Sequence, residues 1–228
     1  MALALGRPLV WLAPNARLAT QLTHATGYAF GGIYTHLFMP TAEEQAVEQT
    51  EKGKRKVQAH AFRTCEDAEN AVYVLEEAHL LGNSYFEREG ERFGSGRLWD
   101  DFLVFTDPGN TARKVILIGD PYQLTRGALA EMPIHGEILS TKGLSVDSYE
   151  LERVIVPAGR EVLTGNAKAL VQSIRTKRFN HLDLIFDGTT FLAPPKGENL
   201  AFAQARFKAD PRGHLLVVYS NKEAMTLN

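Results

Sequence analysis

The sequence predicts an α/β fold in which helices flank a parallel β-sheet. Two short apolar runs, 72–75 and 115–118, are rich in β-branched residues and too short for buried helices, so both are typical of strands buried on two faces. Strand-like and helix-like segments alternate along the chain, which favours a parallel sheet with crossover helices. Polar residues directly follow both runs, and parallel sheets bind their ligands where strands end.

The composition is that of an ordinary globular protein. Hydrophobic residues make up 44% and charged residues 23% of the 228 residues, which is enough apolar surface for a core. No apolar run approaches the ~20 residues that cross a membrane. Gly6-Arg7-Pro8 follows the five apolar residues at the start too soon for a secretory signal. The only cysteine, Cys65, excludes an internal disulfide framework, so we expect a cytoplasmic protein without a membrane partner.

The charge balance does not by itself indicate nucleic-acid binding. The net charge is −2, from 25 basic and 27 acidic residues, whereas nucleic-acid binding usually shows as a basic excess. Two local clusters, 52–56 and 175–178, are rich in Lys and Arg. Each is interpreted either as a solvated turn or as a nucleic-acid contact. His24, His36 and His60 lack metal-ligand spacing, so no metal cluster is expected.

The first half of the chain contains seven expected segments. Pro14-Asn15 opens a helix with Leu18 and Leu22 on one face, and glycines from Gly27 onward break it. In order, the segments are a strand at 9–12, a helix at 14–26, a helical turn at 33–38, a mobile polar excursion at 41–56, a strand at 57–62, an acidic connector at 66–70 and a strand at 72–75.

The second half continues the alternation of strands and helices. Asp107-Pro-Gly-Asn110 is a strong turn signal, and 194–197, Pro-Pro-Lys-Gly, is another. In order, the expected segments are a loop at 82–96, a helix at 97–105, strands at 115–118 and 146–151, helices at 161–175 and 199–208, and a buried strand at 215–219.

Two acids and an amide at the predicted strand ends match the needs of phosphoanhydride hydrolysis. That reaction needs a metal near the β- and γ-phosphates, a group that polarises the attacking water, and a sensor of the γ-phosphate. Glu76 fits the metal role and Glu77 the water-polarising role. Gln123 fits the sensor role, with Asp120 setting the loop. Two alternatives stay open: the acids as an ordinary helix N-cap, and 119–123 as a common tight turn.

Four segments, in order, resemble motifs of superfamily-1 helicases, closest to the RecD-like branch. Residues 76–79, Glu-Glu-Ala-His, resemble motif II (Asp-Glu-Ala-x), and 119–124 resemble motif III (Gly-Asp-x-x-Gln-Leu). Residues 12–19, Leu-Ala-Pro-Asn-Ala-Arg-Leu-Ala, resemble motif Ia. Residues 217–224 resemble the first strand and turn of the second motor lobe, and 33–37 lie where the family has a Thr-Ile-His type segment.

This resemblance implies a RecA-like sheet and an enzyme that uses ATP and Mg²⁺ on single-stranded DNA, with RNA as an alternative. In these terms Glu76 binds Mg²⁺, and Asp120 and Gln123 belong to the ATP site with it. Glu77 and Gln123 are the implied catalytic residues. The residues implied to contact nucleic acid are Pro14, Asn15, Arg17, Tyr122, Ser220 and Asn221.

Three side chains keep two interpretations each. His79 either couples the nucleotide to motif III, as similar positions do in relatives, or is a polar residue at a helix start. Tyr34 and Tyr122 either stack on bases or belong to the core.

The resemblance divides the chain into three parts. Residues 1–156 correspond to the first RecA-like lobe, 157–193 to a helical connector, and 194–228 to the start of a second RecA-like lobe. The phosphate-binding loop of the family, Gly-x-x-Gly-x-Gly-Lys-Thr/Ser, does not occur in the sequence, and Glu76 replaces the family's Asp.

The family's strand before that loop lies between those at 115–118 and 146–151. We therefore expect a sheet that is incomplete at its N-terminus, in a fragment of a longer helicase reading frame that does not hydrolyse ATP by itself. Exposed sheet edges of this kind favour self-association. The alternative is a degenerate helicase-like module that binds nucleic acid or protein without ATPase activity.

Overall fold

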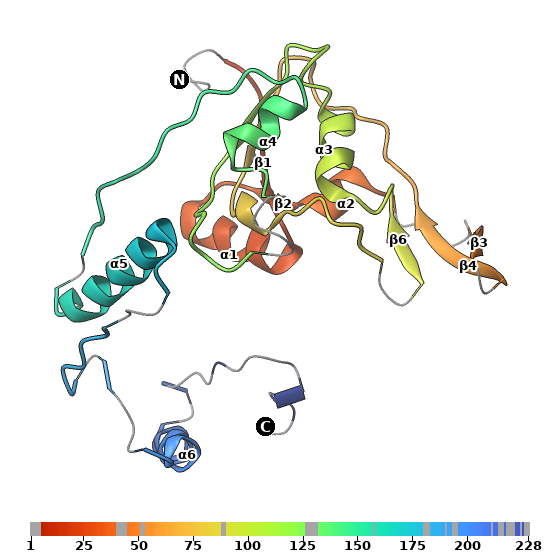
Figure 1. Ribbon diagram of the computed structural model, residues 1–228. Helices are drawn as coiled ribbons and strands as arrows, with labels where there is room; N and C mark the ends of the chain where they lie inside the picture. The colour runs from red at the N-terminus through yellow and green to blue at the C-terminus, as the bar shows by residue number, and fades with distance from the viewer. Residues whose placement is uncertain are drawn as a thin grey trace. The chain divides into compact units, whose positions relative to one another are not determined.

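The computed structural model describes most of the chain, in two units. The described residues are 6–39, 45–50, 53–87, 90–125, 132–156, 158–179, 183–189, 191–192, 196–210, 212–213, 217, 222–223 and 225. The chain divides into compact units of Met1–Glu150 and Leu151–Asn228, which are treated one at a time (Figure 1). The predicted boundaries at 157–193 and 194–228 stay predictions.

The first unit is built on a four-stranded parallel sheet. Its strands are β1 (Leu9–Ala13), β2 (Phe30–Gly32), β5 (Val72–Leu75) and β7 (Lys114–Leu117), in the order β2-β1-β5-β7. Every neighbouring pair is parallel, so all the carboxyl ends lie along one edge. This confirms the predicted α/β class with a mostly parallel sheet and flanking helices.

β5 and β7 differ in burial although their sequences are alike. Every residue of β5 is buried, as predicted. In β7, Val115 and Leu117 contact the core, whereas Ile116 is 44% exposed. The prediction that 115–118 is buried on both faces is therefore wrong. Alternate side chains of a strand face opposite sides, and the described elements cover only one face of β7, which is the last strand of the described sheet.

Helix α1 (Ala16–Thr26) follows β1 at the carboxyl edge, as predicted. Its N-cap is Asn15, whose side-chain oxygen accepts a hydrogen bond from the Leu18 N–H at 2.9 Å. The helix ends at Gly27, whose φ of 78° suits glycine. The helical turn expected next is α2 (Ile33–Leu37). The short strand β2 has no counterpart among the predicted elements, because Phe-Gly-Gly carries no strand pattern.

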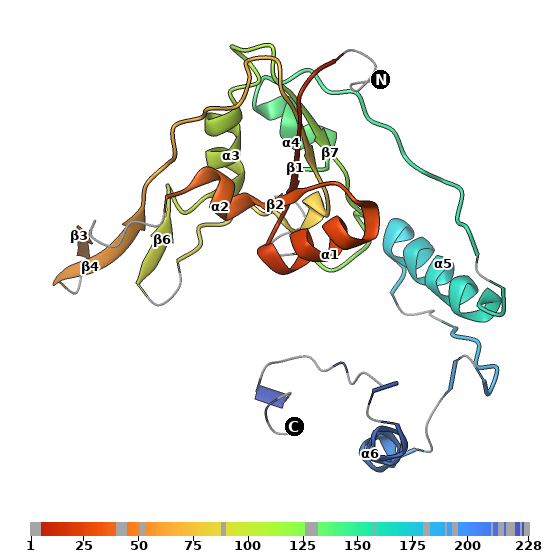
Figure 2. The ribbon, with the colours of Figure 1, turned by 180° about the vertical axis from the view of Figure 1, so that it is seen from behind.

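Helices α2 and α3 cover one side of the sheet. Helix α3 (Leu98–Thr106) confirms the predicted helix and buries Trp99, Phe102 and Phe105. Helix α4 (Gly136–Thr141) adds Leu139 to the same core. Figures 1 and 2 show α2 and α3 together on one side of the sheet, with α1 on the other. Burial of these large apolar side chains is the main favourable term in folding.

A second sheet of three strands lies within the polar part of the first unit. β3 (Gln45–Thr50) pairs antiparallel with β4 (Gly53–His60), and β4 pairs parallel with β6 (Glu91–Phe93). The prediction of a mobile excursion over 41–56 is therefore wrong for the residues described there. Main-chain hydrogen bonds hold this hairpin, and its polar sequence carries no strand signal. The predicted strand at 57–62 is confirmed as far as His60.

The second unit contains two described helices. These are α5 (Glu161–Thr176) and α6 (Asn199–Ala209), and both confirm predicted helices. The buried side chain of Asn166 on α5 donates to the Ile185 carbonyl and accepts from the Ile185 N–H. No helix in the described part of either unit is long and apolar enough to cross a membrane.

Two predicted strands of the C-terminal half are not found as strands. Residues 144–156 have no regular structure, so the predicted strand at 146–151 is wrong. A strand needs a neighbour for its main-chain bonds, and neither described sheet provides one there. Of the predicted strand at 215–219, only Val217 is described, 82% exposed and outside regular structure. The other four positions lie outside the described residues.

Candidate functional site

The carboxyl edge of the sheet brings the acid pair and the 119–123 loop together. Leu12 lies opposite Leu75, and Leu75 opposite Leu117, so β1, β5 and β7 end side by side. Past these ends the main chains stay joined. The Glu76 N–H donates to the Leu12 carbonyl at 3.0 Å, and the Ala78 N–H donates to the Ile118 carbonyl at 2.8 Å.

The chain turns sharply at Glu77. Its φ of 53° and ψ of 38° are left-handed, which is uncommon and costly for a residue with a side chain. Glu77 is the N-cap of a single short turn, η2 (Ala78–Leu80), but its side chain makes no capping hydrogen bond. The interpretation of the acid pair as a helix N-cap therefore has little support, because the turn has three residues and the Glu77 side chain does not cap it.

The Glu76 carboxylate lies in an unfavourable electrostatic environment. Partial burial raises the pKa of Glu76 above its ordinary value, and the negative charge of Glu77 raises it further. A hydrogen bond from the Glu77 backbone acts in the opposite direction. The Glu77 side chain is 36% exposed. A half-buried pair of acids with crowded charge is common at functional sites, although structural networks also produce it.

His79 joins the two loops. The residue is 1% exposed, and its Nδ1 accepts a hydrogen bond from the Asp120 N–H at 3.2 Å. The same Nδ1 lies 3.4 Å from Glu77 Oε2. The Thr125 hydroxyl donates to the His79 carbonyl at 2.7 Å. One nitrogen cannot accept from Asp120 and donate to Glu77 at once, so the position of the ring hydrogen decides which of these two groups Nδ1 binds.

Gly119 allows this close approach. A Cβ at position 119 would lie 3.0 Å from the His79 backbone nitrogen and 3.3 Å from its Nδ1. Glycine is therefore the residue that fits best between β7 and the His79 turn. His79 kept two interpretations in the sequence, and the contacts place it between the loops. Gly119 was part of the motif, whereas Thr125 carries no signal that would have singled it out.

Asp120 shapes the loop after β7. One carboxylate oxygen accepts from the Tyr122 N–H at 2.9 Å, and the other accepts from the Gln123 side-chain amide at 3.2 Å. Gln123 itself is exposed and Tyr122 is half-buried. The geometry fits the predicted loop-setting role of Asp120. It also fixes the orientation of the Gln123 amide at the carboxyl edge.

The residues implied to contact nucleic acid are only partly described. Asn15 and Arg17 are exposed at the start of α1, next to the end of β1, while Pro14 is buried. Asn15 also has a structural task, because its side chain caps α1. Ser220 and Asn221 lie outside the described residues.

The described residues were also searched for metal-binding groups, and the chain was compared with known proteins. Among the residues that the structure describes, no group of three or more His, Cys, Asp or Glu side chains is arranged to hold a metal ion. A scan against models of known protein families found no match to the chain, and a search of curated proteins found none either.

Proposed function

We propose that this chain contains the first RecA-like motor lobe of an ATP-dependent superfamily-1 helicase or translocase that acts on single-stranded nucleic acid. One observation carries the proposal. The acid pair at 76–77 and the loop at 119–123 follow neighbouring parallel strands and share a buried histidine, His79. Motif II and motif III side chains must meet in this way if the state of a nucleotide is to influence the nucleic-acid track.

The strand order supports the same proposal. The strand before the motif Ia-like segment, β1, is beside β5, and β5 is beside β7. Asn15 and Arg17 therefore come after a strand that ends at the same edge of the sheet as the strand before the acid pair. In the described sheet β7 is the last strand, and its outer edge is the position at which the family's phosphate-loop strand is expected.

The side chains at the edge fit a magnesium ion. Mg²⁺ is held by one or two carboxylates together with the phosphates of its nucleotide. A cation beside Glu76 would offset the burial and the Glu77 charge that raise the pKa of this residue. When bound with ATP, Mg²⁺ neutralises charge on the phosphates. Glu77 then orients and polarises the attacking water, and Gln123 is placed by Asp120 to report the γ-phosphate.

The test is ATP hydrolysis by the full protein that contains this sequence. We expect hydrolysis that single-stranded DNA stimulates, and a loss of about 100-fold or more in Glu77→Gln, because positioned acid–base groups contribute about that much. Glu69→Gln, at an exposed position, is the matched control and should keep the wild-type rate. The 228-residue chain should not hydrolyse ATP, because it has no phosphate loop. A DNA-independent rate, or an unchanged rate in Glu77→Gln, contradicts the proposal.

A second candidate is a module that binds nucleic acid or protein without hydrolysis. Glu76 in the place of the family's Asp favours it, since the extra methylene moves the carboxylate by about 1 Å, a distance that matters to catalytic geometry. Under this alternative no variant hydrolyses ATP, and oligonucleotide binding is the same in wild type and Glu77→Gln.

A further inference from the structure

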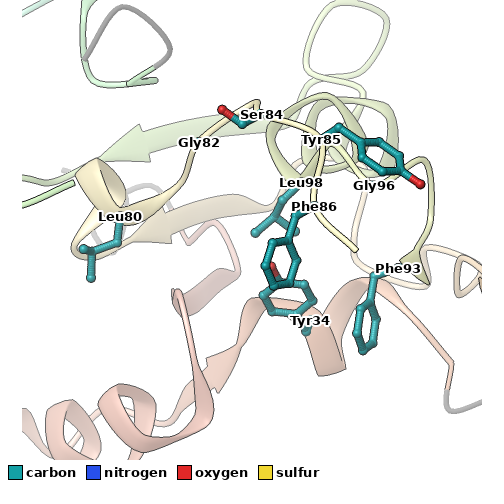
Figure 3. A pocket seen from close by; sticks show the side chains of 9 residues that line it. All are labelled: Tyr34, Leu80, Gly82, Ser84, Tyr85, Phe86, Phe93, Gly96 and Leu98. Carbon is teal, nitrogen blue, oxygen red and sulfur yellow. The ribbon is translucent and has the colours of Figure 1, made fainter. Parts of the chain in front are cut away.

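An aromatic pocket opens beside the carboxyl edge of the sheet. We use the name for the cavity of about 210 Å³ shown in Figure 3, whose lining residues are Tyr34, Leu80, Gly82, Ser84, Tyr85, Phe86, Phe93, Gly96 and Leu98. Tyr34 comes from α2, directly after β2, and Leu80 from the turn after Glu77. The pocket therefore continues from the strand ends that carry the candidate site.

The lining is aromatic, and part of it faces solvent. The Tyr34 and Phe93 rings meet edge to face at 5.0 Å, and the His60 ring stacks on Phe93 at 4.2 Å. Tyr85 and Phe86 remain 49% and 40% exposed. Large aromatic side chains that gather at a hollow and stay half-exposed are typical of a binding surface rather than of a core.

The backbone is adapted to hold Tyr85 at the pocket. Gly96 has a φ of 82°, and a Cβ there would lie 2.7 Å from Tyr85 Cε2. The Phe86 N–H donates to the Gly96 carbonyl at 2.8 Å, which ties the two sides of the loop together. The Tyr85 hydroxyl donates to Glu87 at 3.0 Å. The ring is thus fixed against a glycine and held at its polar end.

An exposed cation, Arg97, lies next to the pocket and could meet a phosphate. Arg97 lies between the lining residues Gly96 and Leu98, is exposed, and donates from Nη1 to the Asn83 carbonyl. Of the acids in the neighbouring segments, Asp100 pairs with Lys142, the buried Asp101 accepts from the Ser95 N–H, and Glu87 accepts from the Tyr85 hydroxyl.

We propose that the aromatic pocket binds one base of a single-stranded nucleic acid, stacked on Tyr85 and Phe86, with Arg97 on the side of the backbone. The cavity is smaller than the roughly 300–1,000 Å³ of sites for drug-sized ligands, which suits one flat ring system. Aromatic side chains bind bases of any sequence by stacking. The inference rests on the proposed nucleic-acid substrate and adds a base-binding position that no helicase-like motif of this chain contains.

The test compares two labelled oligonucleotides, an oligothymidylate of about 12 nucleotides and its abasic counterpart, by fluorescence anisotropy with the 228-residue chain. We expect the thymidylate to bind more tightly than the abasic strand. Tyr85→Ala and Phe86→Ala should each weaken thymidylate binding about fivefold or more, and leave abasic binding unchanged. Tyr85→Phe keeps a stacking ring and should bind like wild type. Tyr149→Ala is the matched control, because Tyr149 is 88% exposed elsewhere.

Several results overturn the inference. These are equal affinity for the two strands, an equal loss on both strands in Tyr85→Ala, no binding of either strand, or a loss in Tyr149→Ala as large as in Tyr85→Ala. Unchanged oligonucleotide binding in Tyr85→Ala, with loss of an association between proteins, assigns the pocket to a protein segment instead. Failure here is distinct from failure of the proposed function, which is measured by ATP hydrolysis and by Glu77→Gln.

Discussion

At the scale of single residues, the ionised Glu76 carboxylate lowers the stability of the fold near pH 7. Its carboxyl group is half-buried next to a like charge, and both effects raise its pKa. The folded protein therefore holds the Glu76 proton more tightly than the unfolded chain does. Proton binding by Glu76 therefore favours the folded state. This contribution is fully present below the ordinary carboxyl pKa of about 4.3 and is lost as the pH rises through the folded-state pKa.

Glu76→Gln should accordingly raise the free energy of unfolding near pH 7, because the amide cannot ionise. The gain should shrink as the pH falls and vanish below the ordinary carboxyl pKa, where Glu76 is protonated in both states. Urea denaturation at the two pH values measures it. Glu69→Gln, at an exposed position, should change stability little at either pH. A loss of stability near pH 7 in Glu76→Gln contradicts the electrostatic account.

At the scale of elements, the link between β6 and α3 depends on one glycine. Gly94 has a φ of 52°, and a Cβ there would lie 2.4 Å from Asp101 Oδ2 and 2.7 Å from Phe38 Cε1. Asp101 is buried and Phe38 belongs to the core, so neither can move aside easily.

Gly94→Ala should lower the free energy of unfolding by about 1–3 kcal/mol, because backbone strain of this kind has that size. Gly165 lies within α5, and a Cβ added there would meet nothing within 4 Å, so Gly165→Ala should stabilise its helix by about 0.5–1 kcal/mol. Chemical denaturation followed by circular dichroism measures both. Equal effects of the two substitutions would show that local backbone geometry does not decide whether alanine raises or lowers the free energy of unfolding.

Several elements could be predicted because each is encoded in its own residues. Asn15 marks the start of α1, the spacing of Trp99, Phe102 and Phe105 marks α3, and the apolar run of β5 marks a buried strand. Of the hairpin of β3 and β4, only the stretch from Val57 to His60 was predicted, since the polar residues of β3 and of 53–56 have no periodic apolar pattern. Strand 146–151 failed for the opposite reason: its residues favour a strand, but no described partner lies beside it.

The candidate site was predictable only in part. Glu76, Glu77, Asp120 and Gln123 were visible because acids and amides at strand ends match a known chemistry. The aromatic pocket was not predicted, apart from Tyr34. Its residues Tyr85, Phe86 and Phe93 lie in the predicted loop at 82–96, but the sequence does not reveal β6, the strand within that loop that positions Phe93.

At the scale of the whole molecule, β7 predicts self-association, because it is an edge strand of the sheet among the residues that the structure describes. An edge strand presents unpaired main-chain groups. Here Ile116 of β7 is 44% exposed, and Ile118, directly after the strand, is 40% exposed. We expect the 228-residue chain to form larger species as its concentration rises, measured by sedimentation velocity. Ile116→Lys should shift the chain toward monomer, because a charge on an edge strand opposes pairing.

Val104→Lys is the matched control for this edge. Val104 is 71% exposed on α3, away from the β7 strand, so the added charge should leave the size distribution unchanged. A wild-type chain that stays monomeric at every concentration, or an equal effect of both lysines, contradicts the role of β7.

The shared nitrogen of His79 has a consequence for how this molecule can vary. Because Nδ1 serves either Asp120 or Glu77 but not both, the ends of β5 and β7 do not act as separate parts. The changes in the free energy of unfolding caused by substitutions at Glu77 and in the 119–123 loop should not be additive. Each substitution changes which partner is available to His79 Nδ1. Neither strand end can therefore change alone. Whether a substitution in one loop is tolerated depends on which group in the other loop can still bind His79 Nδ1.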